Sequence, residues 1–263
     1  MKLRTKFAVA LLAITVLLSA VTVAGLEFLK DQQVNRVQTD VDETAIQTAE
    51  QIRTELDDRR DYVGYVASRD AASDFERSEG LLTGMLDNSR FRNALLVNDT
   101  GVVVGARGTY TPEERRELLG SNVDDGPCVA ETLRTGDQCV SDPVPANDTQ
   151  AVVITAPVFE GGNVTGALVG VIRITDQTFL STLDPLETST QAVVVDHGET
   201  QLHGAHENFS SVITGQARVE RYGWTVRVER DNTALQRQLR QLALAQGVGL
   251  FVVLGIVVGF GYW

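Results

Sequence analysis

All histidines of this chain lie in one short segment, VVVDHGETQLHGAH, which begins at Val193. The segment contains the imidazoles of His197, His203 and His206 and the carboxylate of Glu199, and Glu207 follows it directly. Such groups bind zinc when three or four of them converge at about 2 Å from the ion. In an extended strand, however, His203 and His206 point to opposite faces, and Gly204 lies between them. We therefore interpret the segment as a β-hairpin and predict neither a metal site nor a cofactor.

Motifs of known catalytic chemistry are missing from the sequence. It contains no GxSxG nucleophile elbow, no HExxH helix and no phosphate-binding P-loop. Adjacent carboxylates occur at Asp57-Asp58 and Asp124-Asp125, but both pairs lie in segments rich in charge, which is typical of solvated surfaces. We therefore predict that this segment is not an enzyme, although a kinase could follow Trp263 in a longer protein.

The composition restricts the class of protein. With 263 residues and 43% apolar content, the chain can bury a substantial core. Its net charge of −12 makes nucleic acid an unsuitable partner. The basic residues are almost all arginines, with lysine only at positions 2, 6 and 30. This balance predicts a halophilic archaeon, where salt screens the repulsion between surface charges; an ordinary acidic protein is the alternative.

Two apolar runs predict transmembrane helices. Phe7 to Leu26 contains 20 residues without a charge. At about 1.5 Å per residue, it spans a hydrocarbon core of about 30 Å. The basic residues before it place residues 1–6 in the cytoplasm, and a cleaved signal peptide is the alternative. The second run, Gly247 to Trp263, is uncharged and ends in Tyr262 and Trp263, which suit the membrane interface. A buried core helix is the alternative for this second run.

The region between these runs, residues 27–246, is expected outside the cytoplasm. All four acceptor patterns for N-glycosylation lie there, at Asn98, Asn147, Asn163 and Asn208. The two cysteines, Cys128 and Cys139, also lie there and could form a disulfide in an oxidising compartment; two free buried thiols are the alternative. We therefore predict a two-pass protein of the cell membrane with an extracytoplasmic domain.

A helical stalk is predicted over residues 27–70. Apolar side chains recur there at gaps of three, four and seven, and no proline interrupts them. The stripe consists of Val34, Val37, Val41, Ala45, Ala49, Ile52, Leu56, Val63 and Val66. A stripe this narrow commonly seals against a second copy as well as against a domain, so we expect a homodimer.

The sequence pattern of residues 71–183 predicts a domain that contains both helices and strands. The helical patterns cover 78–88, 111–119 and 127–134. A hairpin is expected around Asn98-Asp99-Thr100-Gly101, and two long strands begin at Ala151 and Val164. Strands, then helices, then a returning antiparallel pair describe an α+β sandwich with helices on one face.

Residues 184–231 predict a smaller copy of this unit. The strand Ala192 to Val195 with its polar turn repeats the strand Ala94 to Val97 with its turn, and both hairpins end in Gly-Ala. Two more strands follow, and residues 232–246 form a helix that leads to the second apolar run.

The order and spacing of these segments resemble the Cache family of extracytoplasmic sensor domains, in its double arrangement with a reduced second module. The resemblance extends over about residues 30–245. It rests on the stalk helix and on the segments LLVNDTGVVVGA, LRTGDQCVSDPV, ITAPVFEGGNVTGALVGVIRI, VVVDHGETQLHGAH and YGWTVRVERD. In this resemblance His203 corresponds to a histidine often found on the second arm of the family's hairpin.

The resemblance implies a PAS-like antiparallel sheet in the membrane-distal module, which binds a small ligand. It also implies that the stalk helices transmit a movement to a cytoplasmic transmitter, commonly a histidine kinase or a methyl-accepting chemotaxis domain. The aromatic-rich signature of the amino-acid-binding subgroup has no counterpart in this sequence, so the ligand class stays open.

Buried polar groups inside such a PAS-like cup are the expected ligand contacts, because an enclosed charge is costly unless a partner pairs with it. The candidates are Arg107, Tyr110, Asp142, Thr155 and Arg173. Arg173 interrupts an apolar strand, and its planar guanidinium suits the carboxylate or phosphate of a small organic anion. Alternatively, Arg173 pairs with Asp142 or Asp176 and braces the fold.

We therefore predict the ligand-sensing input module of a transmembrane receptor, with a transmitter in the same chain or in a partner protein. The alternative is a stand-alone membrane-tethered binding or adhesion protein, which fits a sequence that ends at the second apolar run. A stalk that enters from one span and a helix that leaves to another favour signalling, because this layout passes movement inward.

Overall fold

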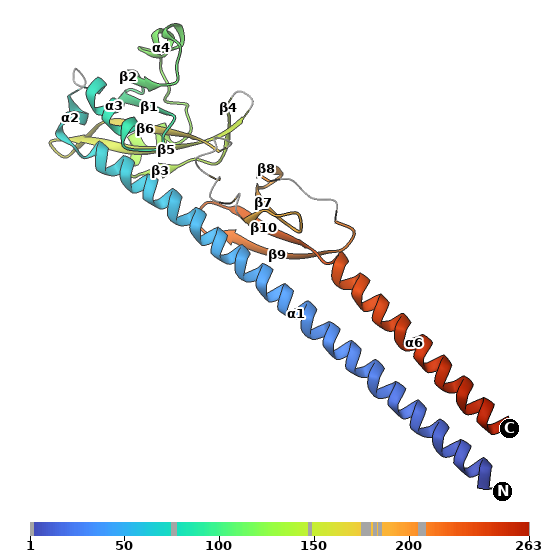
Figure 1. Ribbon diagram of the computed structural model, residues 1–263. Helices are drawn as coiled ribbons and strands as arrows, with labels where there is room; N and C mark the ends of the chain where they lie inside the picture. Colours follow the sequence, from blue (N-terminus) through green and yellow to red (C-terminus); the bar gives the residue numbers. More distant parts are fainter. Residues whose placement is uncertain are drawn as a thin grey trace. The chain divides into compact units, whose positions relative to one another are not determined.

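The structure is a computed structural model that describes residues 3–74, 78–146, 149–174, 180, 183, 186–204 and 209–262. Long helices begin and end the chain, and two β-sheets lie between them in the sequence (Figure 1). The chain divides into two compact units. The first comprises Met1–Thr44, Glu207–Gly215 and Val228–Trp263, and the second comprises Ala45–His206 and Gln216–Arg227.

The helix α1 (Leu3–Ala67) runs without interruption for 65 residues (Figure 1). Its apolar stripe is buried as the sequence predicts, from Val41 to Val66, and the buried members are Val41, Ala45, Ala49, Ile52, Leu56, Val63 and Val66. Val34 and Val37, nearer the N-terminus, are only partly buried. The helix ends at Ala67, slightly before the expected boundary at residue 70.

The other helices are α2 (Asp70–Ser73), α3 (Ser78–Asp87), α4 (Pro112–Leu118), α5 (Val129–Thr135) and α6 (Thr233–Tyr262). α4 begins with a capping box, in which the side chains of Thr111 and Glu114 each bind the other residue's backbone N–H. At the start of α6, the Asp231 carboxylate accepts hydrogen bonds from the hydroxyl and the backbone N–H of Thr233, which lower the pKa of Asp231. Local capping chemistry therefore fixes where both helices begin.

The first sheet has six strands, β1 (Asn93–Asn98), β2 (Val103–Gly108), β3 (Cys139–Val140), β4 (Val144–Ala146), β5 (Thr149–Glu160) and β6 (Asn163–Arg173). Their order is β2-β1-β6-β5-β3, and β4 also pairs with β5. The pairs β1–β2, β1–β6, β3–β5, β4–β5 and β5–β6 are all antiparallel. The hairpin and the long strand pair confirm the prediction, whereas β3 and β4 are too short to leave a periodic signal in the sequence.

Helices cover both faces of this sheet, so the expectation that they cover one face is wrong. Gly105 faces α3, because a Cβ atom at this position would lie 2.9 Å from the Ser78 hydroxyl oxygen. The neighbouring residue Ala106 points to the opposite face, where it shares an apolar cluster with Val129 of α5. Cover on both faces also explains why eight consecutive residues of β5 are buried, because a strand covered on both sides loses the alternation of exposed and buried positions.

The second sheet has four strands, β7 (Gln191–His197), β8 (Thr200–His203), β9 (Val212–Val219) and β10 (Trp224–Asp231). Their order, β8-β7-β10-β9, repeats the order β2-β1-β6-β5 of the first sheet. The two edge hairpins also share a register shift, at Leu96/Val97 in β1 and at Val195/Asp196 in β7. This agreement confirms the internal repeat seen in the sequence.

Large apolar side chains are exposed along both terminal helices. They are Ile14, Val16, Leu17, Val21 and Phe28 on α1 and Leu244, Val248, Phe251, Val252 and Ile256 on α6, each between 55% and 77% exposed. In the part of the chain that the structure describes, no helix meets the length and hydropathy required of a membrane span.

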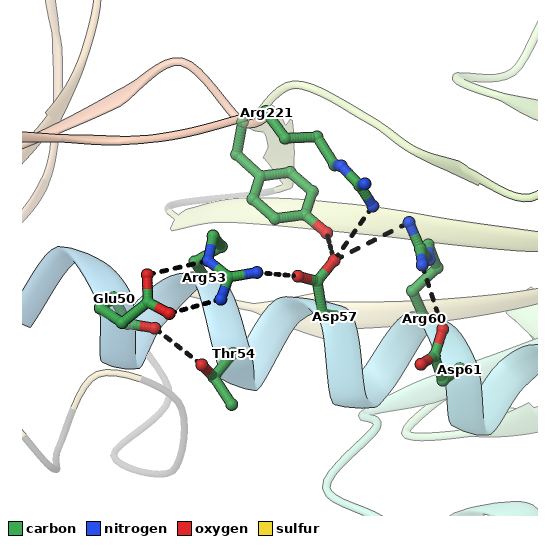
Figure 2. A network of polar contacts seen from close by, with 8 residues as sticks. Glu50, Arg53, Thr54, Asp57, Arg60, Asp61 and Arg221 are labelled. Atoms are coloured by element: carbon green, nitrogen blue, oxygen red, sulfur yellow. Dashed lines mark hydrogen bonds and ion pairs between the residues drawn. The ribbon is translucent and has the colours of Figure 1, made fainter.

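A polar network joins α1 to the turn between β9 and β10 within the second unit (Figure 2). The Asp57 carboxylate accepts hydrogen bonds from the Tyr222 hydroxyl at 2.7 Å, from Arg53 at 2.8 Å and from Arg221 at 3.3 Å. Asp58 is exposed. The interpretation of Asp57-Asp58 as a solvated pair is therefore wrong for Asp57, whose partners in the turn lie far away in the sequence.

Burial, together with the hydrogen bond to Asp57, raises the pKa of Tyr222 to about 12. The folded state therefore favours the neutral phenol, and this contribution to stability is fully present below the usual tyrosine pKa of about 10. It is lost as the pH rises toward 12, because the unfolded chain releases the proton first.

Replacing Tyr222 by Phe should reduce the alkaline sensitivity of folding. Between pH 10 and pH 12, we expect the wild type to lose about 2 kcal/mol more unfolding free energy than Tyr222→Phe does. Denaturant unfolding at each pH measures the difference, and Tyr65→Phe, at an exposed position of α1, is the matched control. Parallel pH profiles for the wild type and Tyr222→Phe would contradict the role given to this hydroxyl.

Candidate functional site

The α5 face is the side of the six-stranded sheet against which α5 packs. The apolar cluster between this face and α5 has the buried members Leu95, Val97, Val103, Ala106, Val129, Val153 and Val169, and Tyr110, Val123, Leu133, Val144 and Val171 lie partly buried around them. Strand register explains the set, because Leu95 lies opposite Val169, and Val169 lies opposite Thr155. The α5 face is therefore an apolar surface that contains few polar groups.

A pair of buried hydroxyls lies between the sheet and α5. Thr132 of α5 and Thr155 of β5 are both 0% exposed, and their hydroxyl oxygens are 2.5 Å apart. The Thr155 hydroxyl also donates to the carbonyl oxygen of Cys128 at 3.4 Å. The Thr132 hydroxyl therefore donates to Thr155. The candidate Thr155 lies beneath α5, and its hydroxyl both accepts a hydrogen bond from Thr132 and donates one to Cys128.

Tyr110 and Arg173 lie at the same face. Arg173 is paired with Ala151 and has the strand parity of Val171 and Val169, so it points to the α5 side of the sheet. Burial, and then the charge of Glu114, raise the pKa of Tyr110 to about 12, while the Arg173 guanidinium acts in the opposite direction. Tyr110 packs against the same apolar cluster as Val171, so Tyr110 and Arg173 lie on the same side of the sheet. Three of the five candidates thus share the α5 face.

Arg107 lies apart from these three residues. It is paired with Ala94, whose side chain points away from the α5 face, and its guanidinium forms an ion pair with Glu79 of α3. Arg115 also approaches Glu79, at 3.4 Å. The sequence could not reveal this difference, since Arg107 and Ala106 are adjacent residues that point to opposite faces of the sheet.

Asp142 is also separate from the three shared candidates. Its side chain is 81% exposed in the connection between β3 and β4, and its carboxylate lies 3.4 Å from the imidazole of His197. The alternative partner of Arg173, Asp176, lies outside the described residues. Asp142 therefore contacts the turn of the second sheet's edge hairpin.

The two cysteines form a disulfide, so the prediction of a crosslink is confirmed and the alternative of free thiols is wrong. Cys128 and Cys139 are bonded, with their Cα atoms 5.5 Å apart. The bond joins the residue before α5 to strand β3.

Two of the four glycosylation candidates lie in described segments. Asn163 is exposed at the start of β6. Asn98 is partly buried, and its side-chain oxygen accepts the backbone N–H groups of Thr100 and Val102 at 3.1 and 2.8 Å, which shapes the hairpin turn. Asn147 and Asn208 lie outside the described residues. Glycosylation stays a prediction for all four.

The histidine segment forms the β7–β8 hairpin, as predicted. His203 lies opposite Val195, and its imidazole is 3.5 Å from the Glu187 carboxylate. Across the residues whose positions are described, no three side chains of the metal-ligating types come together. His206 and Glu207 lie outside the described segments.

The buried hydroxyl pair makes a prediction for stability. Thr155→Val should leave the Thr132 hydroxyl without its buried acceptor, at a cost of about 1–3 kcal/mol. Thr132→Val should have a smaller effect because Thr155 keeps its bond to Cys128. Combining the two substitutions should cost less than the sum of the single changes, because no orphaned hydroxyl remains. Urea unfolding of the four proteins tests this, and strict additivity would contradict it.

Comparisons with known proteins place this fold. No family model matches the chain, and no curated protein matches it. The ligand-binding domain of the Pseudomonas aeruginosa amino acid chemoreceptor PctB, in complex with L-Arg, matches with a TM-score of 0.54 and 17% identity over 80% of this chain and 97% of that one. The ligand-binding domain of the Pseudomonas fluorescens chemoreceptor CtaA, in complex with L-isoleucine, matches with a TM-score of 0.55 and 16% identity over 78% and 98%.

An extracellular ligand binding receptor from Desulfohalobium retbaense is also similar, with a TM-score of 0.53 and 13% identity over 70% of this chain. This chain spans only 39% of that receptor's length. At these identities the likeness concerns the fold and supports the resemblance to the Cache family. The chain therefore has the fold of the extracellular ligand-binding domains of chemoreceptors.

Proposed function

We propose that residues 27–246 are the extracytoplasmic ligand-sensing input module of a transmembrane signal-transduction receptor. The observation that carries the proposal is the fold, which matches nearly the full length of the PctB and CtaA ligand-binding domains. These similar structures are sensor domains rather than enzymes, which supports a non-enzymatic role. The sensing module would be residues 71–183, with residues 184–231 as the smaller module nearer the membrane.

Two membrane spans would hold this module at the cell surface. The proposed spans are residues 7–26 and 247–263, with residues 1–6 in the cytoplasm. The exposed apolar side chains of α1 and α6 support this arrangement, because lipid would cover surface that water would otherwise contact. The bonded cysteines agree with an oxidising compartment for the intervening region.

The ligand would bind at the α5 face. Arg173 offers a planar pair of donors for a carboxylate, Tyr110 adds a neighbouring hydroxyl, and the valines of the face suit the apolar part of a small organic anion. PctB and CtaA are seen with L-Arg and L-isoleucine, so amino acids are the first compounds to test, followed by short carboxylates without an amino group.

Signal output would pass through α1 and α6 to a transmitter of the histidine kinase or chemotaxis type, in the same chain or in a partner. A homodimer through the stalk would align two such outputs. The acidic surface would be an adaptation to high salt, since a net charge of −12 repels itself in dilute solution.

Ligand binding by Arg173 can be measured by titration calorimetry of the full chain in detergent. The compounds are the L-amino acids and the unbranched C2 to C6 carboxylates. For a compound that binds, Arg173→Ala should weaken the affinity by about tenfold or more, because a charged hydrogen bond is lost. Arg134→Ala, an exposed arginine in the last turn of α5, is the matched control. An unchanged affinity in Arg173→Ala would remove this residue from the site.

The signalling role predicts that ligand shifts the two spans relative to each other. Single cysteines can be introduced in α1 and α6 within the spans, for example Val16→Cys with Val252→Cys, and oxidative crosslinking rates followed in membranes. Ligand should change the rate for some pairs, while Arg173→Ala should remove the change. Rates that respond to no bound compound at any pair would favour the stand-alone binding protein.

A further inference from the structure

Cys128 has an unusual backbone conformation. It lies in the left-handed region, with φ 68° and ψ −18°. Among the described residues, Arg221 is the one other non-glycine residue with positive φ. A residue with a Cβ atom is disfavoured in this region, so it persists where its surroundings hold it, and such positions are often parts of switches.

The disulfide is the covalent restraint on Cys128. Its partner Cys139 lies on β3 directly opposite Thr155 of β5. The Cys128 carbonyl oxygen accepts the backbone N–H of Thr132 at 3.0 Å and the hydroxyl of Thr155 at 3.4 Å. The conformation of Cys128 therefore determines both the first turn of α5 and its polar contact with the sheet.

The remaining contacts of α5 with the sheet include the packing of Val129 and Leu133 in the apolar cluster and the hydroxyl pair of Thr132 and Thr155. A helix of seven residues has little stability of its own and depends on such contacts. Both cysteines are only partly buried, so a reductant can reach the bond.

We propose that Cys128–Cys139 is a thiol–disulfide exchange site that controls the docking of α5 on the α5 face. In the oxidised protein, the bond holds Cys128 at positive φ and α5 covers the face. In the reduced protein, Cys128 returns to negative φ, its carbonyl turns away from Thr132 and Thr155, and α5 separates from the sheet. The receptor would thereby sense the ligand only in an oxidising environment, a consequence that rests on the proposed ligand site at this face.

The reaction partner is a dithiol. Its thiolate attacks one cysteine sulfur, the Cys128–Cys139 bond breaks, and the released sulfur takes up a proton. The second thiol of the reductant then displaces the remaining cysteine from the mixed disulfide. Two electrons and two protons pass to the cysteines, and the reductant becomes a disulfide.

Hydrogen exchange of the full chain in lipid nanodiscs, with and without dithiothreitol, tests the inference. Reduction should speed exchange in residues 129–136 by roughly tenfold or more. The strain of one residue is large enough to shift the equilibrium between docked and separated α5 by about that factor once the crosslink no longer holds it. Exchange in α3, on the other face of the sheet, should stay unchanged. No acceleration in residues 129–136 on complete reduction would overturn the inference.

Two variants distinguish the effect of losing the disulfide from the effect of relieving the positive φ at Cys128. Cys128→Ser with Cys139→Ser should exchange rapidly in residues 129–136 whether or not dithiothreitol is present. Cys128→Gly with Cys139→Ser should exchange more slowly than the serine pair, because glycine adopts positive φ without penalty. Equal exchange in the two variants would overturn the strain mechanism.

Calorimetry with the same L-amino acids and carboxylates distinguishes this inference from the proposed function. Reduction should weaken the affinity for a bound compound in parallel with the exchange of residues 129–136. Full affinity after complete reduction would overturn redox control while leaving the sensor role intact. Reduction could instead speed hydrogen exchange in residues 129–136 while no tested compound binds the wild type more tightly than it binds Arg173→Ala. That result would overturn the proposed ligand site and leave the exchange site supported.

Discussion

The antiparallel pairing of β5 with β6 is the interaction on which the rest of the structure depends. Both strands are apolar on both sides, so neither face of the sheet can be left in water. α3 covers one face, and the connection between β2 and β3 must supply the cover for the other. The position of α5, and with it the candidate site, follows from this requirement.

The α5 face combines an apolar surface with a small number of polar groups in defined places. The hydroxyls of Thr132 and Thr155 satisfy each other, so they are suited to holding α5 in position. Tyr110 and Arg173 lie at the same face with polar groups that can contact a ligand. This division, between hydroxyls that hold α5 and polar groups beside it, suits the ligand site proposed at this face.

The second sheet repeats the strand order of the first, but a polar contact with α1 holds one of its turns in place. Its β9–β10 turn is held by Asp57 of α1 through Tyr222 and Arg221, and Arg221 adopts positive φ at this point. Three donors converge on one carboxylate, which makes the contact specific for both position and charge. The two non-glycine residues with positive φ among those described therefore lie at the two attachments, Cys128 at the cover of the first sheet and Arg221 at the turn of the second.

The sequence by itself determined the features that depend on neighbouring residues. The buried stripe of α1, the helix α4, the hairpins and the internal repeat all follow from periodicity and local turn chemistry, and each is confirmed. The disulfide could also be expected, because two cysteines in one domain have one possible partner each. These features depend on neighbouring residues or, for the cysteines, on there being a single possible pair, so no knowledge of packing is needed to predict them.

Only the tertiary structure decided which polar residues share a site. Arg107 and Arg173 both interrupt apolar strands, yet register places Arg173 on the α5 face and Arg107 against Glu79 on the other. Asp57 looked like a solvated carboxylate because its partners Arg221 and Tyr222 are more than a hundred residues away in the sequence. Strand register and the side on which a helix crosses a sheet are set by long-range pairing, and one residue of register moves a side chain to the opposite face.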